Sequence, residues 1–340
     1  MENAIVYVHL GESKPATLLH FVEEMRRNYA YSNLFLISDF PENWSDFPGT
    51  VLHLDREFQS FFPLAWRVLH HDWMSVASGY WKNTLLRLFC LEQLSRCDLI
   101  SEDCLIVHVE SDVLVMSCPT ILTQLRKSIR KTSVVRLADD LAIAAIVLIP
   151  GKAELQNFTK GLRNLLFRDF RWKIDMKLLA LAIDEGICDD LNSYEILMPV
   201  TLGRNQILLD GWPAGQYLFG QDPIHTNGEI SGGYLSPYSR FDFTQGHWRM
   251  DIVDGCCPHN HLLFRNEERD HVVASLHVHS KLLVNAPNSS DKLWIQTIEA
   301  ANEGRGFPVF RGNPSSEIHT SNGPFSARVI RRVKSLFSHV

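Results

Sequence analysis

Two carboxylates stand in the middle of an apolar run, in the segment CLIVHVESDVLV (residues 104–115). Glu110 and Asp112 are separated by one residue, so on an extended chain both side chains point to the same side. A carboxylate that is withdrawn from water is costly unless it is paired or bound to a cation. The segment therefore predicts either a strand end that tolerates two acids or a site that holds a positive group. Mg²⁺ and Mn²⁺ are often bound by one or two carboxylates together with phosphate oxygens.

A second polar cluster lies far along the chain, in SLHVHSK (residues 275–281). His277 and His279 have the same one-residue separation, and Lys281 follows on the same face if the segment is extended. Two imidazoles and an ammonium on one face suit a metal ion and a phosphate. A surface strand with alternating polar residues has the same pattern, so both interpretations stay open.

Three further acids are candidates for a general base, which must deprotonate an acceptor hydroxyl. Asp175 lies at the start of the helical pattern DMKLLALAID, where an acid is also favoured as a helix cap or by the helix dipole. Asp210 and Asp222 flank the glycine-rich segment GWPAGQYLFGQ. The glycines of this segment allow close backbone approach to a ligand, and Tyr217 could stack on a sugar ring or pack in a core.

The elements that must position these residues follow a βαβα alternation in the first half of the chain. Expected strands are 4–10, 34–39, 50–55, 104–109, 133–138 and 141–150, and expected helices are 16–27, 80–97, 119–131, 152–166 and 174–186. This order predicts a mostly parallel sheet with helices on its faces. Ligands bind such sheets at the carboxyl ends of the strands, where Asp39 and the two acids of residues 110–112 are expected. Residues 191–275 are richer in Gly, Pro and aromatics, which is typical of loops and short strands.

The composition of the 340 residues, 45% hydrophobic and 21% charged, is that of an ordinary globular protein with a sizeable core. The net charge of −6 argues against general nucleic-acid binding, which requires a basic face. Seven scattered cysteines without a C-x-x-C pair indicate reduced thiols and a cytoplasmic protein. The N-terminal MENAIVYVHL has no basic region before its short apolar run, so we expect a first strand rather than a signal peptide.

Taken in order, five segments resemble bacterial GT-A-type glycosyltransferases of surface-polysaccharide biosynthesis. They are GYWKNTLLRLFCLEQL, LIVHVESDVLV, IDMKLL, LDGWPAGQYLFGQDP and SLHVHSK, and the resemblance covers roughly residues 4–284. It implies a GT-A-like α/β fold with a Rossmann-type, mostly parallel central sheet. It also implies one catalytic domain over residues 1–284, with a nucleotide-sugar and metal half (1–150) and an acceptor half (151–284). Residues 285–340 would then be a loop-rich extension.

The resemblance implies a nucleotide-diphospho-sugar donor, an Mn²⁺ or Mg²⁺ ion, and a saccharide or lipid-linked acceptor. Asp112 would be the direct metal ligand, His277 or His279 would complete the metal site, and Lys281 would meet phosphate. Glu110 would contact the ribose or the donor sugar, and the other implied donor-binding residues are His9, Gly11, Asp39 and Arg87. If the reaction inverts configuration, the candidate bases are Asp175, then Asp210 and Asp222; if it retains configuration, no base is required.

Other functions fit the same residues. The acids and histidines could serve a metal-dependent hydrolase or phosphotransferase, or the chain could be a non-catalytic carbohydrate-binding protein on a transferase fold. The chain ends in SARVIRRVKSLFSHV (326–340), a basic amphipathic pattern that can lie on the inner face of an anionic membrane. A solvated terminal helix has the same pattern, and both interpretations stay open.

Overall fold

The computed structural model describes residues 3–29, 33–54, 79–116, 119–168, 174–191, 206–209, 213–219, 239, 242–252, 260–266, 269–278 and 290–303. The backbone separates into two compact units, Met1–Pro308 and Val309–Val340, and every described residue belongs to the first. The terminal segment 326–340 lies outside the described residues, and the domain boundary expected after residue 284 stays a prediction. Among the described residues, no helix is both long and apolar enough to cross a membrane.

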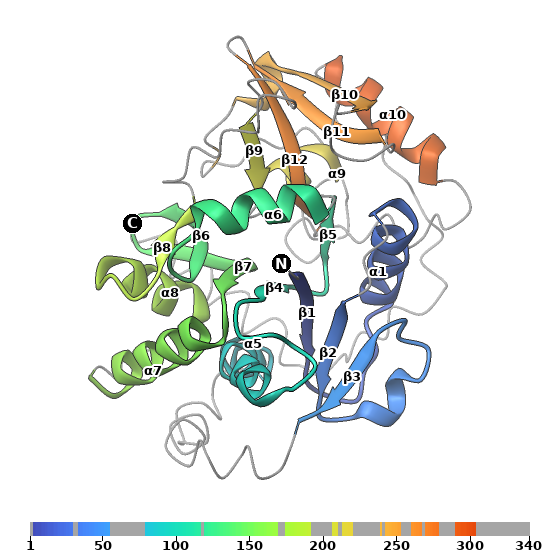
Figure 1. Cartoon of the computed structure of the whole chain (residues 1–340). Helices are drawn as coiled ribbons and strands as arrows, with labels where there is room; N and C mark the ends of the chain where they lie inside the picture. The colour runs from blue at the N-terminus through green and yellow to red at the C-terminus, as the bar shows by residue number, and fades with distance from the viewer. Residues whose placement is uncertain are drawn as a thin grey trace, which may run out of the picture. The chain divides into compact units, whose positions relative to one another are not determined.

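A seven-stranded sheet is the framework of the N-terminal half (Figure 1). Its strands, in spatial order, are β3 (Thr50–His53), β2 (Leu34–Ser38), β1 (Asn3–His9), β4 (Leu105–Val109), β7 (Leu141–Pro150), β6 (Ser133–Ala138) and β8 (Asp189–Asp190). The pairs β3–β2, β2–β1, β1–β4 and β6–β8 are parallel, whereas β7 is antiparallel to both β4 and β6. Strands β6 and β7 are joined through Asp139 and Asp140 alone, and such a short connection permits only antiparallel pairing. The sheet is therefore mostly parallel, as predicted, with β7 as the exception.

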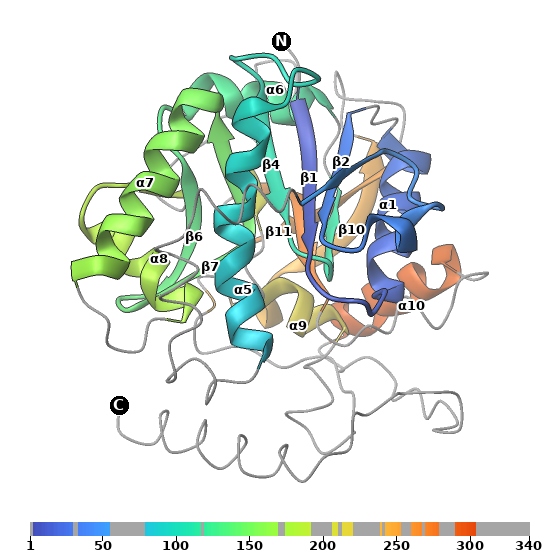
Figure 2. The ribbon, with the colours of Figure 1, turned by 90° about the horizontal axis from the view of Figure 1, so that it is seen from below.

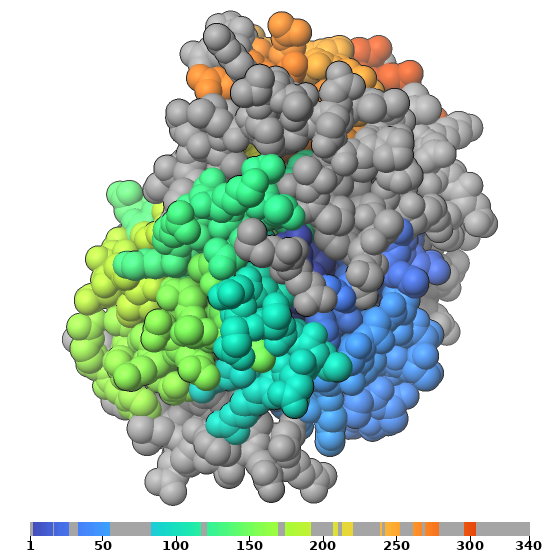
Figure 3. Space-filling model, in the orientation of Figure 1, coloured from blue at the N-terminus to red at the C-terminus, as the bar shows by residue number. Residues whose placement is uncertain are grey.

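Helices cover both faces of this sheet (Figure 2). Strand alternation sorts the core: Ile5 and Tyr7 of β1 pack with one group of helices, and Ala4 and Val6 pack with the other. The first group is α1 (Ala16–Tyr29) and α6 (Pro119–Ser128); the second is α5 (Gly79–Cys90), the 3₁₀ helix η2 (Leu91–Arg96), α7 (Lys152–Arg168) and α8 (Asp175–Asp184). A further 3₁₀ turn, η1 (Pro41–Trp44), follows β2. In the space-filling view, α5 (teal) lies between the N-terminal strands (blue) and α7 (green) (Figure 3). The predicted fold class, α/β with a mostly parallel, helix-flanked central sheet, is confirmed.

A second sheet of five strands is built mainly from the C-terminal part of the chain (Figure 1). Its strands are β10 (His247–Ile252), β11 (Asn260–Arg265), β12 (Asp270–His277), β5 (Val113–Val115) and β9 (Gln206–Leu209). The order is β10-β11-β12-β5, with β9 pairing parallel to β12. Strand β5 follows β4 of the first sheet after only three residues, so the chain passes directly from one sheet to the other at residues 110–112.

Two helices and an aromatic cluster complete the core of the second sheet. They are α9 (Pro213–Phe219) and α10 (Ser290–Asn302), with a 3₁₀ turn η5 at Phe243–Gln245. Tyr217 is buried with its ring against Phe243 and Trp248, and its hydroxyl donates to the Ala301 carbonyl at 3.3 Å. Of the two interpretations of Tyr217, the structure therefore places it in the core.

Two segments expected to be loops are helical. Pro213 stands at the first position of α9, where its fixed φ and missing N–H are well tolerated, so the Gly- and Pro-rich letters concealed a helix start. Helix α10 lies inside the extension expected to be loop-rich. Its side chain Asn302 accepts from the Trp248 N–H at 2.6 Å and donates to the Trp248 carbonyl at 2.8 Å, which ties the end of α10 to β10.

Candidate functional site

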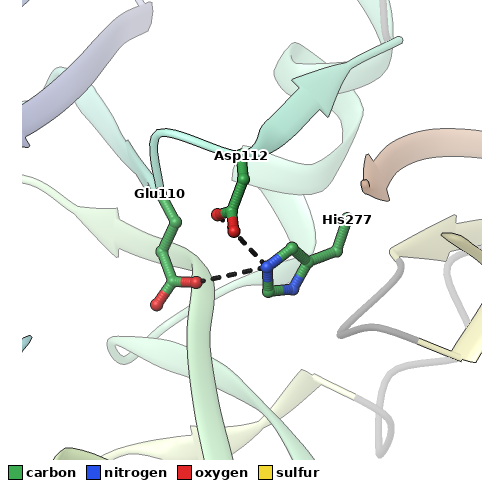
Figure 4. Close-up of side chains that lie close together, drawn as sticks. All are labelled: Glu110, Asp112 and His277. Atoms are coloured by element: carbon green, nitrogen blue, oxygen red, sulfur yellow. Dashed lines mark ion pairs between the residues drawn. The ribbon is translucent and has the colours of Figure 1, made fainter. Parts of the chain in front are cut away.

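The acids of residues 110–112 lie on a turn between the two sheets. The Val113 N–H donates to the Glu110 carbonyl at 3.2 Å, and the Glu110 N–H donates to the Ala145 carbonyl of β7 at 3.1 Å. The sequence analysis assumed an extended segment here, and that local geometry is wrong because the chain turns as it leaves β4 for β5. The turn still directs both carboxylates to one side (Figure 4).

Backbone pairing brings His277 to these acids from 165 residues further along the chain than Asp112. His277 is the last residue of β12 and pairs with Val113 of β5, and the Val278 N–H donates to the Asp112 carbonyl at 2.8 Å. The His277 Nε2 atom lies 3.2 Å from Asp112 Oδ1 and 3.5 Å from Glu110 Oε2 (Figure 4). The imidazole is 1% exposed, whereas Asp112 is 23% exposed. We call Glu110, Asp112 and His277 the metal triplet.

The metal triplet fits a divalent cation. One ligand atom from each of its residues lies within 4.8 Å of the others. Two carboxylates and one imidazole are a donor set that Mg²⁺ or Mn²⁺ can use, with remaining positions for water or phosphate. Arg87 and Asp175 also interact electrostatically with Glu110, so three carboxylates stand against one guanidinium. With a neutral imidazole this cluster carries a formal charge of −2, which a dication would offset.

Burial shapes the acid–base chemistry of Glu110. Loss of water raises the pKa of its carboxyl above the ordinary value, and Arg87 and His277 oppose that rise by favouring the charged form. The nearby carboxylates of Asp112 and Asp175 raise the pKa further. A cation at the metal triplet would favour the deprotonated form, because it adds positive charge beside Glu110.

Arg87 and Asp175 reach the same carboxylate from the two helices α5 and α8. The Arg87 guanidinium donates to Glu110 Oε1 and, at 3.0 Å, to Asp175 Oδ2. Asp175 is the first residue of α8, as the sequence predicts, but its side chain makes no capping hydrogen bond within that helix. Its other oxygen, Oδ1, is buried with no hydrogen-bond partner among the described residues.

A separate polar cluster lies at the carboxyl ends of β1 and β2. The Gly11 N–H donates to Asp39 Oδ1 at 2.9 Å, and Gly11 has a φ of +111°, a conformation that favours glycine. The ring of His9 packs edge-on against Trp44 with 5.2 Å between centroids. Burial lowers the pKa of His9, which favours the neutral imidazole. The structure thus brings together three of the residues expected at the donor site.

Trp44 was not among the sequence candidates. It lies in the 3₁₀ turn PENW, which is too short to produce a periodic pattern, and only its position soon after a strand end could have suggested it. The Lys14 ammonium lies 5.4 Å from the centroid of this ring. Four of the predicted site residues, His279, Lys281, Asp210 and Asp222, lie outside the described residues, and their roles stay predictions.

No protein-family model matches this chain, and no curated protein is significantly similar to it. Partial structural similarity extends to mouse xyloside xylosyltransferase 1 in its apo form, at 10% identity and a TM-score of 0.39, covering 56% of this chain and 85% of that one. The glycosyltransferase GlyE of Streptococcus pneumoniae gives 15% identity and a TM-score of 0.37, with 56% of this chain and 45% of that one covered.

The bifunctional IspDF of Campylobacter jejuni is similar at 11% identity and a TM-score of 0.30, with 57% of this chain and 50% of that one covered. The chain therefore spans about half the length of two of these three proteins. Similarity this low does not discriminate between activities, so the function must be argued from the side chains.

Proposed function

We propose that this chain is a metal-dependent glycosyltransferase that moves a sugar from a nucleotide-diphospho-sugar donor to a saccharide or lipid-linked acceptor. The observation that carries the proposal is the metal triplet of Glu110, Asp112 and His277 at the carboxyl end of β4. In a mostly parallel α/β sheet this edge is where ligands bind. A second polar cluster, Gly11 and Asp39, follows β1 and β2 at the same edge of the sheet.

The described side chains divide the work of binding. Asp112, with its partly exposed carboxylate, and the buried His277 would hold a Mn²⁺ or Mg²⁺ ion together with Glu110. When bound, such an ion stabilises the charge that develops on a departing nucleoside diphosphate. Gly11 and Asp39 would hold the nucleoside, since Asp39 is already oriented by the Gly11 N–H and retains lone pairs for hydroxyl donors.

Several finer expectations belong to this proposal. His279 and Lys281 would contribute to the metal and phosphate site, and Asp210 or Asp222 would be the remaining candidates for an acceptor base. The sugar transfer would serve surface-polysaccharide synthesis in the cytoplasm, with the terminal segment 326–340 resting on the membrane surface. These roles derive from the sequence patterns and the family resemblance given above.

A thermal-shift screen of nucleotide-sugars with and without Mn²⁺ tests the proposal, because a ligand that binds the native state raises apparent stability. We expect at least one nucleotide-sugar to raise the melting temperature only when Mn²⁺ is present, and to be consumed in a transfer or hydrolysis assay. Asp112→Asn should abolish both effects, whereas Asp103→Asn, at an exposed acid just before β4, should leave them intact.

Three results would contradict the proposal. One is a fully active Asp112→Asn variant, and another is activity that persists in excess chelator. The third is tightly bound zinc at one ion per chain without nucleotide binding, which would favour a hydrolase or phosphotransferase instead.

A further inference from the structure

The Arg87 guanidinium joins two carboxylates that come from different elements. Glu110 follows β4 and Asp175 opens α8, and both accept a hydrogen bond from the same guanidinium nitrogen. The three side chains are 15%, 11% and 4% exposed for Arg87, Glu110 and Asp175, so water screens these pairs poorly. Removing one partner from such an arrangement leaves a charge without compensation, which is far more costly than losing a surface ion pair.

The two oxygens of Glu110 face different neighbours. Oε1 accepts from Arg87, while Oε2 faces His277 Nε2 at 3.5 Å. Arg87 therefore holds one edge of the carboxylate, and the opposite edge is presented to the metal triplet. Carboxylates that bind metals are commonly oriented in this way by outer hydrogen-bond partners.

Asp175 is poorly disposed to act as the acceptor base. A base must come within hydrogen-bond reach of the hydroxyl that it deprotonates. The Asp175 side chain is 4% exposed, and one of its oxygens is held by Arg87 at 3.0 Å. Its position suits a different task, which is to fix the guanidinium from the side away from Glu110.

We propose that Arg87 is a positioning residue that orients Glu110 in the metal triplet, and that Asp175 acts through Arg87 rather than as a base. The inference rests on the proposed metal-dependent function. It reassigns two residues that the family resemblance linked to donor binding and to proton transfer.

Charge alone and positioning predict opposite results for one substitution. Arg87→Met removes a positive charge beside the site, and by Coulomb's law alone this should tighten the binding of a cation. If Arg87 positions Glu110, the same substitution should weaken cation binding, because the carboxylate loses the partner that orients it.

The test is a Mn²⁺ titration of the full chain, followed by the EPR signal of free Mn²⁺, without nucleotide and with each of UDP, GDP and CMP. We expect Arg87→Met to bind Mn²⁺ roughly 10- to 100-fold more weakly, the range typical for loss of an outer-shell partner. Arg87→Lys keeps the charge without the planar fork and should lie between. The matched control is Arg163→Met, whose partly buried pair with Glu92 at 2.6 Å joins α7 to η2 and includes none of the triplet.

A double-mutant cycle tests the role of Asp175. If Asp175 acts through Arg87, Asp175→Asn weakens Mn²⁺ binding in the wild-type background and has little further effect in Arg87→Met. Additive effects would overturn this part of the inference. So would an Asp175→Asn variant that loses turnover while its Mn²⁺ affinity is unchanged, since that is the behaviour of a base.

Unchanged or tighter Mn²⁺ binding by Arg87→Met overturns the positioning role and leaves the proposed function standing. A wild-type chain that binds no Mn²⁺ under any of the nucleotide conditions overturns both. If circular dichroism shows that Arg87→Met does not fold, Arg87→Lys and Asp175→Asn are judged against the same predictions.

Discussion

At the scale of single residues, the site depends on where buried charges find partners. Glu110 would be an expensive buried acid by itself, but Arg87 and His277 lie beside it and Asp112 shares the imidazole. The same logic explains why His277 is tolerated at 1% exposure. An imidazole between two carboxylates can stay neutral or become charged without a large desolvation cost, which is the property that a metal ligand requires.

His108 supplies a prediction about acid stability. It is buried in β4, its Nδ1 lies 3.1 Å from the Val6 carbonyl, and burial lowers its pKa from 6.5 to about 3. Below pH 6.5 the unfolded chain gains a proton at this residue, whereas the folded chain does not until the pH approaches 3. Stability should therefore fall as the pH drops through this window, by about 2 kcal/mol at pH 5 from this residue alone.

Urea unfolding of the wild type and His108→Gln between pH 7 and pH 5 measures this effect. The variant should lose less unfolding free energy than the wild type over that interval, even if it is less stable at pH 7. Parallel pH profiles for the two proteins would show that His108 is not the source.

At the scale of elements, the metal triplet is created by one strand exchange. The chain leaves the first sheet at Glu110 and enters the second at Val113, so the turn presents its acids where β5 pairs with β12. His277 then arrives by register rather than by proximity in sequence. The helices α5 and α8 add Arg87 and Asp175 from the opposite side of β4.

The sequence reveals the parts of this arrangement that are local. Apolar alternation predicts β4, and helical periodicity predicts α5 and α8, so the placement of Asp112 after a strand and of Asp175 at a helix start could be foreseen. The guanidinium bridge of Arg87 could not, because it depends on how two helices pack. The helix α9 was missed because Gly and Pro, read as loop signals, also occur at a helix start.

The contact between α10 and β10 gives a stability prediction at this scale. Asn302 satisfies both backbone groups of Trp248, so Asn302→Asp replaces the donating amide with a second acceptor beside the Trp248 carbonyl. We expect a loss of roughly 1–3 kcal/mol of unfolding free energy, the cost of leaving a buried polar group unpaired. Gln296→Ala, at an exposed position of the same helix, is the control for denaturant unfolding and should change stability little. Equal stabilities of the two variants would mean that this contact contributes little.

At the scale of the whole molecule, two sheets share one core and meet at the candidate centre. The core on the α1 and α6 side of the first sheet is continuous with the aromatic core of the second, including Tyr217, Trp248 and Phe264. The ligand-binding edge of a parallel sheet and the end of β12 are thereby held against each other. The fold class could be predicted from the alternation of elements, but the second sheet could not, because β5 is only three residues long and joins strands of distant sequence.

The most direct measurement of the central claim is pulsed EPR of Mn²⁺ bound to the full chain. If the metal triplet binds the ion, the spectrum should show electron spin-echo modulation from a directly coordinated imidazole nitrogen. His277→Gln should lose that modulation, whereas His271→Gln, at another buried imidazole of the same strand, should keep it. Wild-type Mn²⁺ without nitrogen modulation, or modulation that survives in His277→Gln, would contradict the assignment of this site.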